Sequence, residues 1–545
     1  FELSQEVLGT GYSGDVKLGL HRATGQEVAV KHFTKKRLEA RRLKMLQSEV
    51  EVYLSVDHPH ICRLLHAYEG KRDVWLVMEL CGSELYSRLC QRKTYGERDA
   101  ADVMTQMLQA VSYLHSHQIV HRDLKLENWM YGATGVDDRL KLIDFGFSRR
   151  LVSEGEVLDM PCGTLHYTSP EVLTRKYTSQ CDLWSLGVVC YMLLLGRPPF
   201  KGPNSVKVAK AIMQNDLPRD KQWESLSPSA RDFVARLLEK DASKRLDAQT
   251  ALAHGWLAEA CGGNCDSVPS AVPGSLAPDV LRNLRKFTQG SHLQRAALTV
   301  MAYGLTSREI QDFEQAFLAL DTSRRGTISL AQLVEVLQRY PEVSSKEIQR
   351  IFASMDSTMG EEIHYTLFIA AMLATRVRIH EDKVRAAFQA FDSDGTGYIT
   401  ADALTRVVSR RLGNGVAGGK TDIAGPPADG CLSRDEAAEW IREVDYKGNG
   451  VVDYEGFLAA LMGQRLGPRP QDCPEVRVFE ARGKRPRSFS DTELGSARPR
   501  IHHRVAAAVI DRAGERRAQS FCPGDAAETV QVRKVMCDVD ERYFA

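Results

Sequence analysis

Hydrophobic and polar positions follow two different patterns within the first 257 residues of the chain. Up to about residue 80, short valine-rich runs such as 28–30 and 74–77 alternate with one helical stretch near 36–55. Short runs of β-branched residues are typical of strands. From residue 84 onward the apolar residues recur with helical spacing, and loops separate the helices. The pattern therefore predicts a small β-rich lobe followed by a larger α-rich lobe.

The longest apolar stretch covers residues 183–195 and contains Trp184 and Ser185. A helix needs about 20 apolar residues to cross a bilayer, so this stretch is too short to do so. We predict a helix that is buried in the α-rich lobe.

The second half of the chain divides into four sections. Residues 258–277 are rich in Gly, Ser and Pro, which predicts a linker. Residues 278–305 combine leucines with Arg and Lys in a helical pattern, which is typical of a calmodulin-target helix or of a linker helix with a solvated basic face. Residues 306–465 repeat a helix–loop–helix pattern. Residues 466–545 are basic and lack sustained periodicity, so we predict a mostly disordered tail.

Composition narrows the classes of function. A chain of 545 residues is long enough for two or three domains, and its formal net charge of +1 favours neither nucleic acid nor an acidic membrane as a partner. Its 12 cysteines include no CxxC pair, so we expect free thiols and a cytoplasmic location. The chain begins at Phe1 within a strand-like pattern, so we expect further residues to precede it. Membrane attachment through an acylated N-terminus stays open.

Two short motifs near the N-terminus are typical of phosphate binding. Residues 9–16 read Gly-Thr-Gly-Tyr-Ser-Gly-Asp-Val, and glycines let backbone amides approach phosphates without a Cβ in the way. A simple glycine turn is the alternative interpretation of this motif alone. The run Val-Ala-Val-Lys places Lys31 on a predicted strand, where it can reach the α- and β-phosphates of ATP. Glu49, on the following helix, is the natural ion-pair partner of Lys31.

Two further motifs supply a catalytic carboxylate and oxygen ligands for a metal ion. Residues 121–128 read His-Arg-Asp-Leu-Lys-Leu-Glu-Asn. Here Asp123 can accept the hydrogen bond of an attacking hydroxyl, Lys125 can neutralise the transferred phosphoryl group, and Asn128 can offer an oxygen to Mg²⁺. Asp144, in the run Asp-Phe-Gly, supplies a second Mg²⁺ ligand. These residues predict a site for ATP and Mg²⁺.

In this order and spacing, the motifs resemble the protein kinase family over residues 1–257. The resemblance implies an α+β bilobal fold with ATP in the cleft. Lys125 and the pair Gly163-Thr164 indicate serine/threonine rather than tyrosine specificity. Met78 lies at the gatekeeper position, and the implied nucleotide contacts are Gly9, Gly11, Gly14, Val16, Ala29, Lys31, Met78, Glu79 and Cys81.

The same resemblance implies two supporting contacts. Asp182 is expected to brace the catalytic loop from below. Glu171 is expected to pair with Arg245.

Substrate-binding positions also follow from the resemblance. Glu84, after the hinge, and Glu127, in the catalytic loop, match positions where related kinases receive substrate arginines. Pairing between a carboxylate and a guanidinium gives the physical reason for such a preference. Thr164 is expected at the substrate site as well. We therefore expect protein substrates with Arg near the target Ser or Thr.

Arg122, next to Asp123, normally needs an anion from the activation segment to hold the catalytic loop active. The residue four positions before Thr164 is Met160, which cannot be phosphorylated. We predict that one of the nearby carboxylates of Glu154, Glu156 and Asp159 takes the place of the phosphate, with Asp159 the first choice.

The kinase domain, the basic helix and the four repeats, in this order, resemble the calcium-dependent protein kinases of plants and apicomplexan parasites over roughly residues 1–465. The resemblance implies an all-α, calmodulin-like EF-hand module that binds Ca²⁺, contacts the junction helix and releases kinase inhibition. The four loops are 321–332, 356–367, 392–403 and 445–456.

These loops depart from the pattern of a working Ca²⁺ loop, which carries oxygen ligands at positions 1, 3, 5, 7 and 9 and a bidentate glutamate at position 12. All four lack that glutamate, because position 12 is occupied by Gln332, Leu367, Ala403 and Gly456. The third loop is the best preserved, with the candidate ligands Asp392, Asp394, Thr396, Tyr398 and Thr400.

An apolar residue at position 8 of each loop predicts that paired loops form a short β contact, through Ile328, Ile363, Ile399 and Val452. We therefore predict a folded module with weakened Ca²⁺ affinity. Two roles stay open for it: a blunted Ca²⁺ switch that uses the third loop, or the third and fourth as a pair, and a docking scaffold on a calcium-independent kinase. A catalytically silent scaffold is a further alternative, which the presence of Lys31, Asp123 and Asp144 disfavours.

Overall fold

The computed structural model describes residues 1–11, 14–22, 25–35, 40–132, 139–153, 155–260, 277–305, 309–338, 343–355, 362–375, 381–392, 394–411 and 432–464. Most of the predicted linker, the start of the second loop, including Asp356, and the whole predicted tail lie outside these residues.

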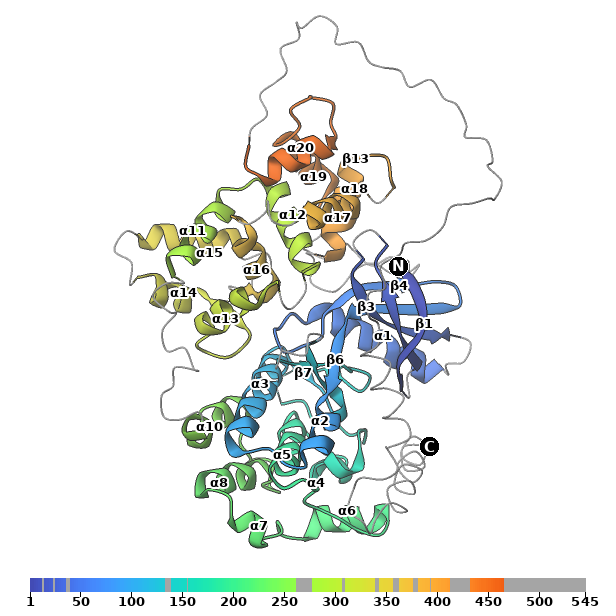
Figure 1. Ribbon diagram of the computed structural model, residues 1–545, viewed down its shortest axis with the longest axis vertical. Coiled ribbons are helices and arrows are strands. Elements are labelled where there is room, and N and C mark those ends of the chain that lie inside the picture. The colour runs from blue at the N-terminus through green and yellow to red at the C-terminus, as the bar shows by residue number, and fades with distance from the viewer. Residues whose placement is uncertain are drawn as a thin grey trace, which may run out of the picture. The chain divides into compact units, whose positions relative to one another are not determined.

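The first lobe is a five-stranded antiparallel sheet with one helix (Figure 1). Its strand order is β1-β2-β3-β5-β4, and the sequence pattern had predicted strands and one helix here. Alternate residues of a strand share one face, so the register decides which side chains meet in the cleft. In this register Val16 lies opposite Lys31 and Ala29 opposite Met78. The elements are β1 (Glu2–Gly11), β2 (Gly14–Leu20), β3 (Glu27–Thr34), α1 (Ala40–Ser55), β4 (Leu64–Glu69) and β5 (Asp73–Glu79).

The second lobe is mostly helical, as predicted. Its longest helices, α3 and α5, pack against each other. Short strands and 3₁₀ turns carry the catalytic loop and the activation segment. The elements are β6 (Cys81–Glu84), α2 (Leu85–Arg92), α3 (Glu97–Ser116), β7 (Ile119–Val120), η2 (Leu126–Asn128), β8 (Trp129–Gly132), β9 (Leu140–Leu142), β10 (Arg149–Arg150), η3 (Leu165–Tyr167), α4 (Pro170–Leu173), α5 (Gln180–Leu195), α6 (Ser205–Gln214), α7 (Lys221–Glu224), α8 (Pro228–Leu237), α9 (Ala248–Leu252) and α10 (Gly255–Ala260).

The apolar stretch 183–195 lies in α5, and its side chains are buried from Cys181 to Leu195. The prediction of a buried helix is therefore confirmed. Among the described helices, none is both long and apolar enough to cross a membrane.

The module after the kinase domain consists of four helix–loop–helix units joined in pairs. Ile328 pairs with Ile363 between the first two loops, and Ile399 pairs with Val452 between the last two. These position-8 contacts confirm the prediction from the sequence. The elements are α13 (Gln311–Leu320), β11 (Thr327–Ser329), α14 (Leu330–Leu337), α15 (Ser345–Met355), β12 (Glu362–His364), α16 (Tyr365–Leu373), α17 (Glu381–Phe391), β13 (Tyr398–Ile399), α18 (Ala401–Arg411), α19 (Arg434–Arg442), β14 (Val452–Asp453) and α20 (Tyr454–Leu461).

The segment predicted as one junction helix forms two, α11 (Ala277–Thr288) and α12 (His292–Tyr303). The break falls at Gly290 and Ser291, because the Ser291 hydroxyl accepts the N–H of Gln294 at 3.2 Å and starts a new helix. Helix α11 packs on α15 and α16, and α12 packs on α16, α17 and α20.

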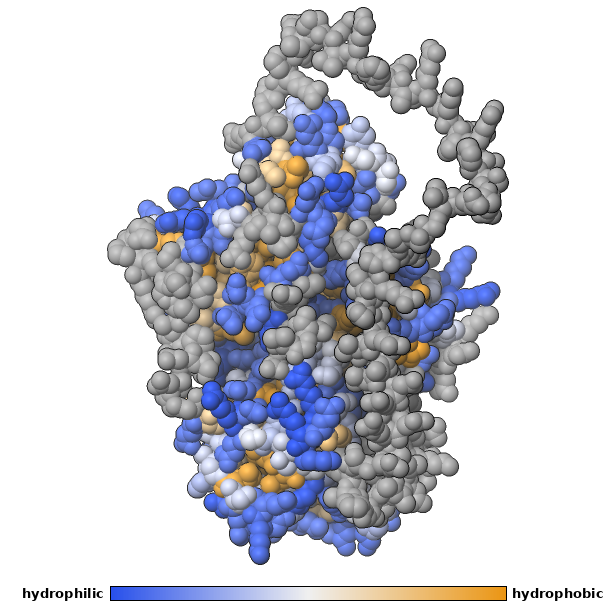
Figure 2. Space-filling view, in the orientation of Figure 1, coloured by the Kyte–Doolittle hydropathy of each residue, from blue (hydrophilic) through white to orange (hydrophobic). Residues whose placement is uncertain are grey.

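Each domain has a separate main hydrophobic core. One core contains most of the buried apolar residues of the kinase domain, including those of α3 and α5. The other runs from Val280 to Leu461, so both junction helices belong to the EF-hand module. With the apolar residues gathered in these cores, hydrophilic residues dominate the face shown in Figure 2.

A buried ion pair ties the activation segment to the end of the helical lobe. The Arg245 guanidinium lies 2.5 Å from Glu171 Oε1 and donates a second hydrogen bond to Oε2 at 3.0 Å. The arginine side chain is fully buried, so the pairing expected from the sequence satisfies a guanidinium that water does not reach.

We predict that Arg245→Met destabilises the kinase domain by about 3 kcal/mol, because Glu171 would keep its charge in a largely dry place. The midpoint of the kinase domain's thermal transition should fall by roughly 6–12 °C, measured by calorimetry on the full chain. Arg92→Ala is the control, because the pair of Arg92 with Asp99 is exposed and contributes at most about 1 kcal/mol. Equal shifts for the two variants would contradict the prediction.

Candidate active site

Lys31 joins three elements of the fold at the back of the cleft. Its Nζ lies 2.8 Å from Oε1 of Glu49 on α1 and 3.4 Å from Oδ1 of Asp144, which follows β9. Burial lowers the pKa of Lys31, but the carboxylates of Asp144 and Glu49 outweigh burial and raise it. The ammonium group therefore stays charged and faces the place where phosphates are expected.

Phe145 packs inward and fixes the orientation of its neighbour Asp144. The Phe145 ring is fully buried, 4.7 Å from the ring of Tyr53 on α1 and 5.3 Å from that of His121. The N–H of Gly146 donates to Asp144 Oδ1 at 3.0 Å. These contacts hold the carboxylate of Asp144 on the side of Lys31.

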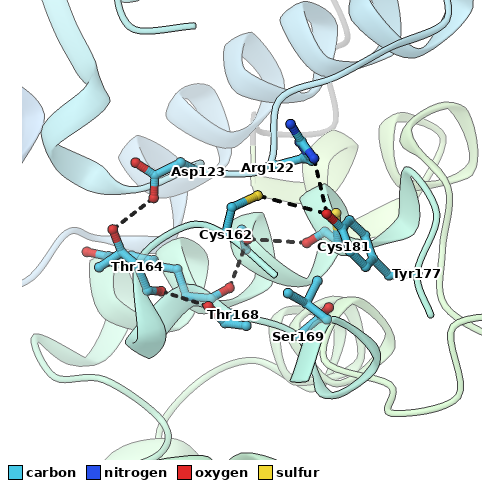
Figure 3. A pocket seen from close by; sticks show the side chains of 11 residues that line it. Arg122, Asp123, Cys162, Thr164, Thr168, Ser169, Tyr177 and Cys181 are labelled. Atoms are coloured by element: carbon cyan, nitrogen blue, oxygen red, sulfur yellow. Dashed lines mark hydrogen bonds between the residues drawn. The ribbon is translucent and has the colours of Figure 1, made fainter. Parts of the chain in front are cut away.

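The catalytic loop brings Asp123, Lys125 and Thr164 into contact. Lys125 Nζ lies 2.6 Å from Asp123 Oδ2. The Thr164 hydroxyl donates to Asp123 Oδ1 at 2.8 Å, as Figure 3 shows. Gly163 makes this approach possible, since its φ is +95° and a Cβ there would lie 2.5 Å from the main-chain oxygen of Arg122.

Asp182 fixes the backbone of this loop. Its carboxylate accepts the N–H of His121 at 2.9 Å and that of Arg122 at 2.8 Å, and His115 contacts it from α3. Arg122 has a φ of +70°, which is unfavourable for a side chain of its size. The fully buried Asp182 therefore holds the strained backbone in place, which is the bracing role expected from the sequence.

The residues predicted to contact the nucleotide lie on neighbouring strands. Gly9, Gly11 and Gly14 lie at the turn between β1 and β2, where Gly11 pairs with Gly14. Val16, Ala29 and Met78 belong to β2, β3 and β5, which adjoin in the sheet. Glu79 ends β5 and Cys81 begins β6, so both lie in the connection between the lobes. The structure thus places the whole set around the cleft, while the contact of each residue with ATP stays a prediction.

Asn128 and Asp144, the two predicted Mg²⁺ ligands, fit a hard cation. Asn128 donates its amide N–H to the main-chain oxygen of Asp123 at 2.9 Å, which leaves the amide oxygen for a metal. Burial raises the pKa of Asp144, but Lys31 and the N–H of Gly146 outweigh burial and lower it, so the carboxylate is ionised. Mg²⁺ bound here would neutralise charge on the ATP phosphates.

The arrangement suits phosphoryl transfer to a hydroxyl group. Asp123 can accept the proton of the hydroxyl, and Lys125 lies beside it to face the transferred group. Burial lowers the pKa of Lys125, but Asp123 raises it by more, so this ammonium is charged as well.

Arg122 and the activation segment meet at a small pocket of about 10 Å³, which has room for roughly one water molecule and not for a substrate. Figure 3 shows Arg122 directed at Tyr177, whose hydroxyl accepts from Nη1 at 3.3 Å and donates to the main-chain oxygen of Met160 at 2.6 Å. The Nε of Arg122 donates to the oxygen of Phe147 at 2.7 Å. Among the described residues, neutral oxygens therefore hold the Arg122 side chain.

This differs from the prediction that Asp159 replaces the phosphate. Asp159 is exposed, Glu156 instead pairs with Arg149 at 2.8 Å, and Glu154 lies outside the described residues. The sequence could not show the role of Tyr177, because only folding brings its hydroxyl to Arg122.

Glu84 and Glu127, the two predicted substrate carboxylates, belong to β6 and η2, which contact each other. Burial raises the pKa of Glu127, and the charges of Asp123 and Glu84 add smaller increases. Glu84 accepts from the Ser87 hydroxyl at 3.1 Å, and Glu127 accepts from Tyr167 at 3.4 Å. Within the described residues neither carboxylate is paired with an arginine.

The third EF-hand loop keeps the shape of a cation site. Asp392 accepts the N–H groups of Thr396 and Gly397, both at 2.8 Å. The Thr396 hydroxyl lies 3.3 Å from Asp394 Oδ1 and 3.2 Å from the main-chain oxygen of Tyr398, so four predicted ligands surround one region.

Thr400, the fifth predicted ligand, accepts the N–H of Ala403 at 3.2 Å and caps the next helix instead. Asp402, next to position 12, pairs with Arg434 at 3.0 Å. Within the described residues no group of three or more His, Cys, Asp or Glu side chains is arranged to hold a metal ion.

In the first and fourth loops, side chains of the protein contact the residues that a Ca²⁺ ion would need. Gln332, at position 12 of the first loop, donates to Asp321 Oδ1 at 3.5 Å. Lys447, at position 3 of the fourth loop, forms an ion pair with Asp453 at position 9. The contact of Lys447 with Asp453 could have been predicted from the sequence, because positions 3 and 9 bind the same ion in a working loop and therefore lie close together.

Comparison with known proteins agrees with this geometry. Residues 3–257 match the protein kinase domain family, and residues 381–462 match the EF-hand domain pair. Calcium-dependent protein kinase 12 of Arabidopsis thaliana is 33% identical over 462 residues, which cover 84% of this chain and 88% of that protein. Calcium-dependent protein kinase 34 of the same plant is 34% identical, covering 86% of each chain. Calcium-dependent protein kinase 5 of Plasmodium falciparum is 29% identical, covering 85% of this chain and 78% of that protein.

The kinase domain and its assembled catalytic residues define a protein serine/threonine kinase. The match continues through the EF-hand module, and the chain belongs to the calcium-dependent protein kinase family.

We predict that this kinase is active without phosphorylation of its activation segment, because neutral oxygens already hold Arg122. Tyr177→Phe should lower kcat about tenfold, since it removes the hydroxyl between Arg122 and Met160. The measurement is peptide phosphorylation by phosphatase-treated protein, with Asp159→Asn as a control that should keep the wild-type kcat. Activity that appeared only after Ser153 was phosphorylated would contradict this prediction.

Proposed function

We propose that this kinase phosphorylates Ser and Thr residues near arginine in protein substrates, and that its EF-hand module binds Ca²⁺ weakly. The arginine preference rests on one observation, that β6, which ends at Glu84, contacts η2, which carries Glu127 in the catalytic loop. A guanidinium between them would be attracted by both carboxylates and would offset their mutual repulsion. The cost of keeping two acids together is thus offset when an arginine binds.

We predict that Glu127→Gln raises KM for an Arg-x-x-Ser peptide by about tenfold or more and changes kcat little. Glu84→Gln should act in the same direction. A peptide with alanine in place of the arginine is the control, and its KM should be the same for wild type and variant. Equal KM values of the wild-type enzyme for the two peptides would contradict the proposal.

The same site predicts a pH dependence. Because burial raises the pKa of Glu127, this group becomes neutral at a higher pH than an exposed glutamate does. The ionised form attracts the guanidinium, so KM for the arginine peptide should rise as the pH falls through that pKa. The dependence should be weaker in Glu127→Gln, which has no group to titrate at this position.

The proposal of weak Ca²⁺ affinity rests on what occupies the loops. Gln332 and Lys447 contact the carboxylates of the first and fourth loops, and Ala403 and Gly456 supply no oxygen at position 12. A bidentate glutamate at that position normally provides two of the roughly seven ligand oxygens of the ion. The third loop, alone or paired with the fourth, remains the candidate Ca²⁺ site.

We predict that the full chain binds Ca²⁺ with a Kd of about 10⁻⁴ M or weaker in isothermal titration. Asp392→Ala should remove this binding, because Asp392 organises the third loop. Asp321→Asn, in the first loop, is the matched control and should leave it unchanged. A Kd in the low micromolar range would contradict the proposal.

The alternative is a docking scaffold on a calcium-independent kinase. It is favoured by the contacts that the first EF-hand loop makes with the kinase domain. The cytoplasmic location expected from the sequence also stays a proposal, which the free thiols of the six described cysteines support.

A further inference from the structure

We propose that the first EF-hand loop has become a metal-independent docking element, which holds the module on the segment between α1 and β4 of the kinase domain. The inference deepens the proposed function and rests on the weak Ca²⁺ affinity stated there. The residues at the Ca²⁺-ligand positions of the first loop do not by themselves indicate this role.

The first loop satisfies its own carboxylate. Asp321 accepts hydrogen bonds from the N–H of Gly326 at 2.6 Å, from the N–H of Arg325 at 3.2 Å and from the Ser323 hydroxyl at 2.9 Å. Gln332 adds an amide donor from position 12, so positions 1 and 12 contact each other directly. The loop therefore keeps its closed shape with protein donors in the place of an ion.

The position of Gln332 is itself fixed. Its side-chain oxygen accepts the N–H of Ser329 at 2.7 Å, and the Ser329 hydroxyl accepts the N–H of Gln332 at 3.3 Å. This reciprocal capping box begins α14 and holds the amide over the loop. Because this neutral donor is fixed in place, the loop is ordered without a metal ion.

The outer side of the first loop packs against the kinase domain. Gly326 has a φ of +75°, and a Cβ there would lie 2.5 Å from side-chain atoms of both His58 and Tyr113. Arg324, two residues earlier, donates to the main-chain oxygen of Leu252 at 2.9 Å. The turn of the loop thus fits a surface that only glycine can approach.

The equivalent turns of the other described loops are open. Gly397 and Gly450 occupy the same position 6 in the third and fourth loops, with φ values of +82° and +75°. Nothing lies within 4 Å of a Cβ built on either glycine. The three glycines have similar φ values, so contact with the kinase domain is what distinguishes the first loop.

Neighbouring contacts reach the same segment of the kinase domain. Asp57 accepts the N–H of Thr366 at 2.7 Å and its hydroxyl at 2.6 Å. Arg63 donates to the main-chain oxygen of Ala302 at 3.2 Å and to that of Leu305. These two hydrogen bonds cap the C-terminal end of α12. These bonds join main-chain and side-chain groups of the protein and include no metal ligand.

The kinase segment between α1 and β4, on which the module docks, adjoins two residues of the catalytic cleft. It follows α1, which carries Glu49, and it contains Arg63, whose Nε lies 3.5 Å from Oε2 of Glu79 between the lobes. The N–H of Arg63 also donates to Glu79 Oε1 at 2.8 Å. Docking of the module therefore fixes residues directly behind the ATP site.

The test is hydrogen–deuterium exchange of the full chain in the presence of a Ca²⁺ chelator, read at peptides covering residues 57–63 and 321–332. Gly326→Ala should speed exchange of both segments by about tenfold or more. Gly450→Ala is the matched control, because it adds the same methyl group at the same loop position and φ, in open space. It should leave both segments at the wild-type rate.

A second pair of variants covers the case that Gly326→Ala fails to fold. Arg324→Ala removes the bond to Leu252 and should speed exchange of both segments, while Arg325→Ala, at the exposed neighbour, should not. Equal rates within both pairs would overturn the proposal. So would protection of residues 57–63 that appears only when Ca²⁺ is added. Failure of the proposed function would show separately, as a low micromolar Kd for Ca²⁺ or as equal KM values for the arginine and alanine peptides.

Discussion

The ammonium of Lys31 lies between two carboxylates that belong to different parts of the kinase domain. Glu49 reaches it from α1, and Asp144 reaches it from the start of the activation segment. Burial makes each charge costly by itself, so the three groups stabilise one another only when strand, helix and activation segment meet in this arrangement. The nucleotide site, the inward packing of Phe145 and the position of the catalytic loop all depend on this contact.

The requirement that a buried or clustered charge be paired also explains the loops of the EF-hand module. A working EF-hand loop gathers carboxylates around Ca²⁺. In the first and fourth loops the protein supplies its own donors, the amide of Gln332 and the ammonium of Lys447. Loops that are closed by their own side chains support the proposal of weak Ca²⁺ affinity, because a metal ion would then gain little differential affinity for one conformation of the kinase over another.

The activation segment shows the same replacement of an ion by neutral groups. Met160 cannot supply a phosphate to Arg122, and the hydroxyl of Tyr177 and the main-chain oxygen of Phe147 accept the hydrogen bonds of Arg122. The catalytic loop is then held by a buried carboxylate, Asp182, and by the close approach of Gly163. Both contacts belong to the fold and do not require a modification of the chain.

The sequence by itself determined the two-domain order, the strand and helix content of each lobe, the catalytic residues and the position-8 pairing of the loops. These features are local in pattern, because motif spacing and apolar periodicity are written along the chain. The tertiary structure alone decided which groups meet across long separations in sequence. It placed Tyr177 at Arg122, split the junction helix and buried both halves in the module, and brought Gly326 against His58 and Tyr113. Such contacts depend on how separately formed elements pack, and no periodicity in the sequence records that packing.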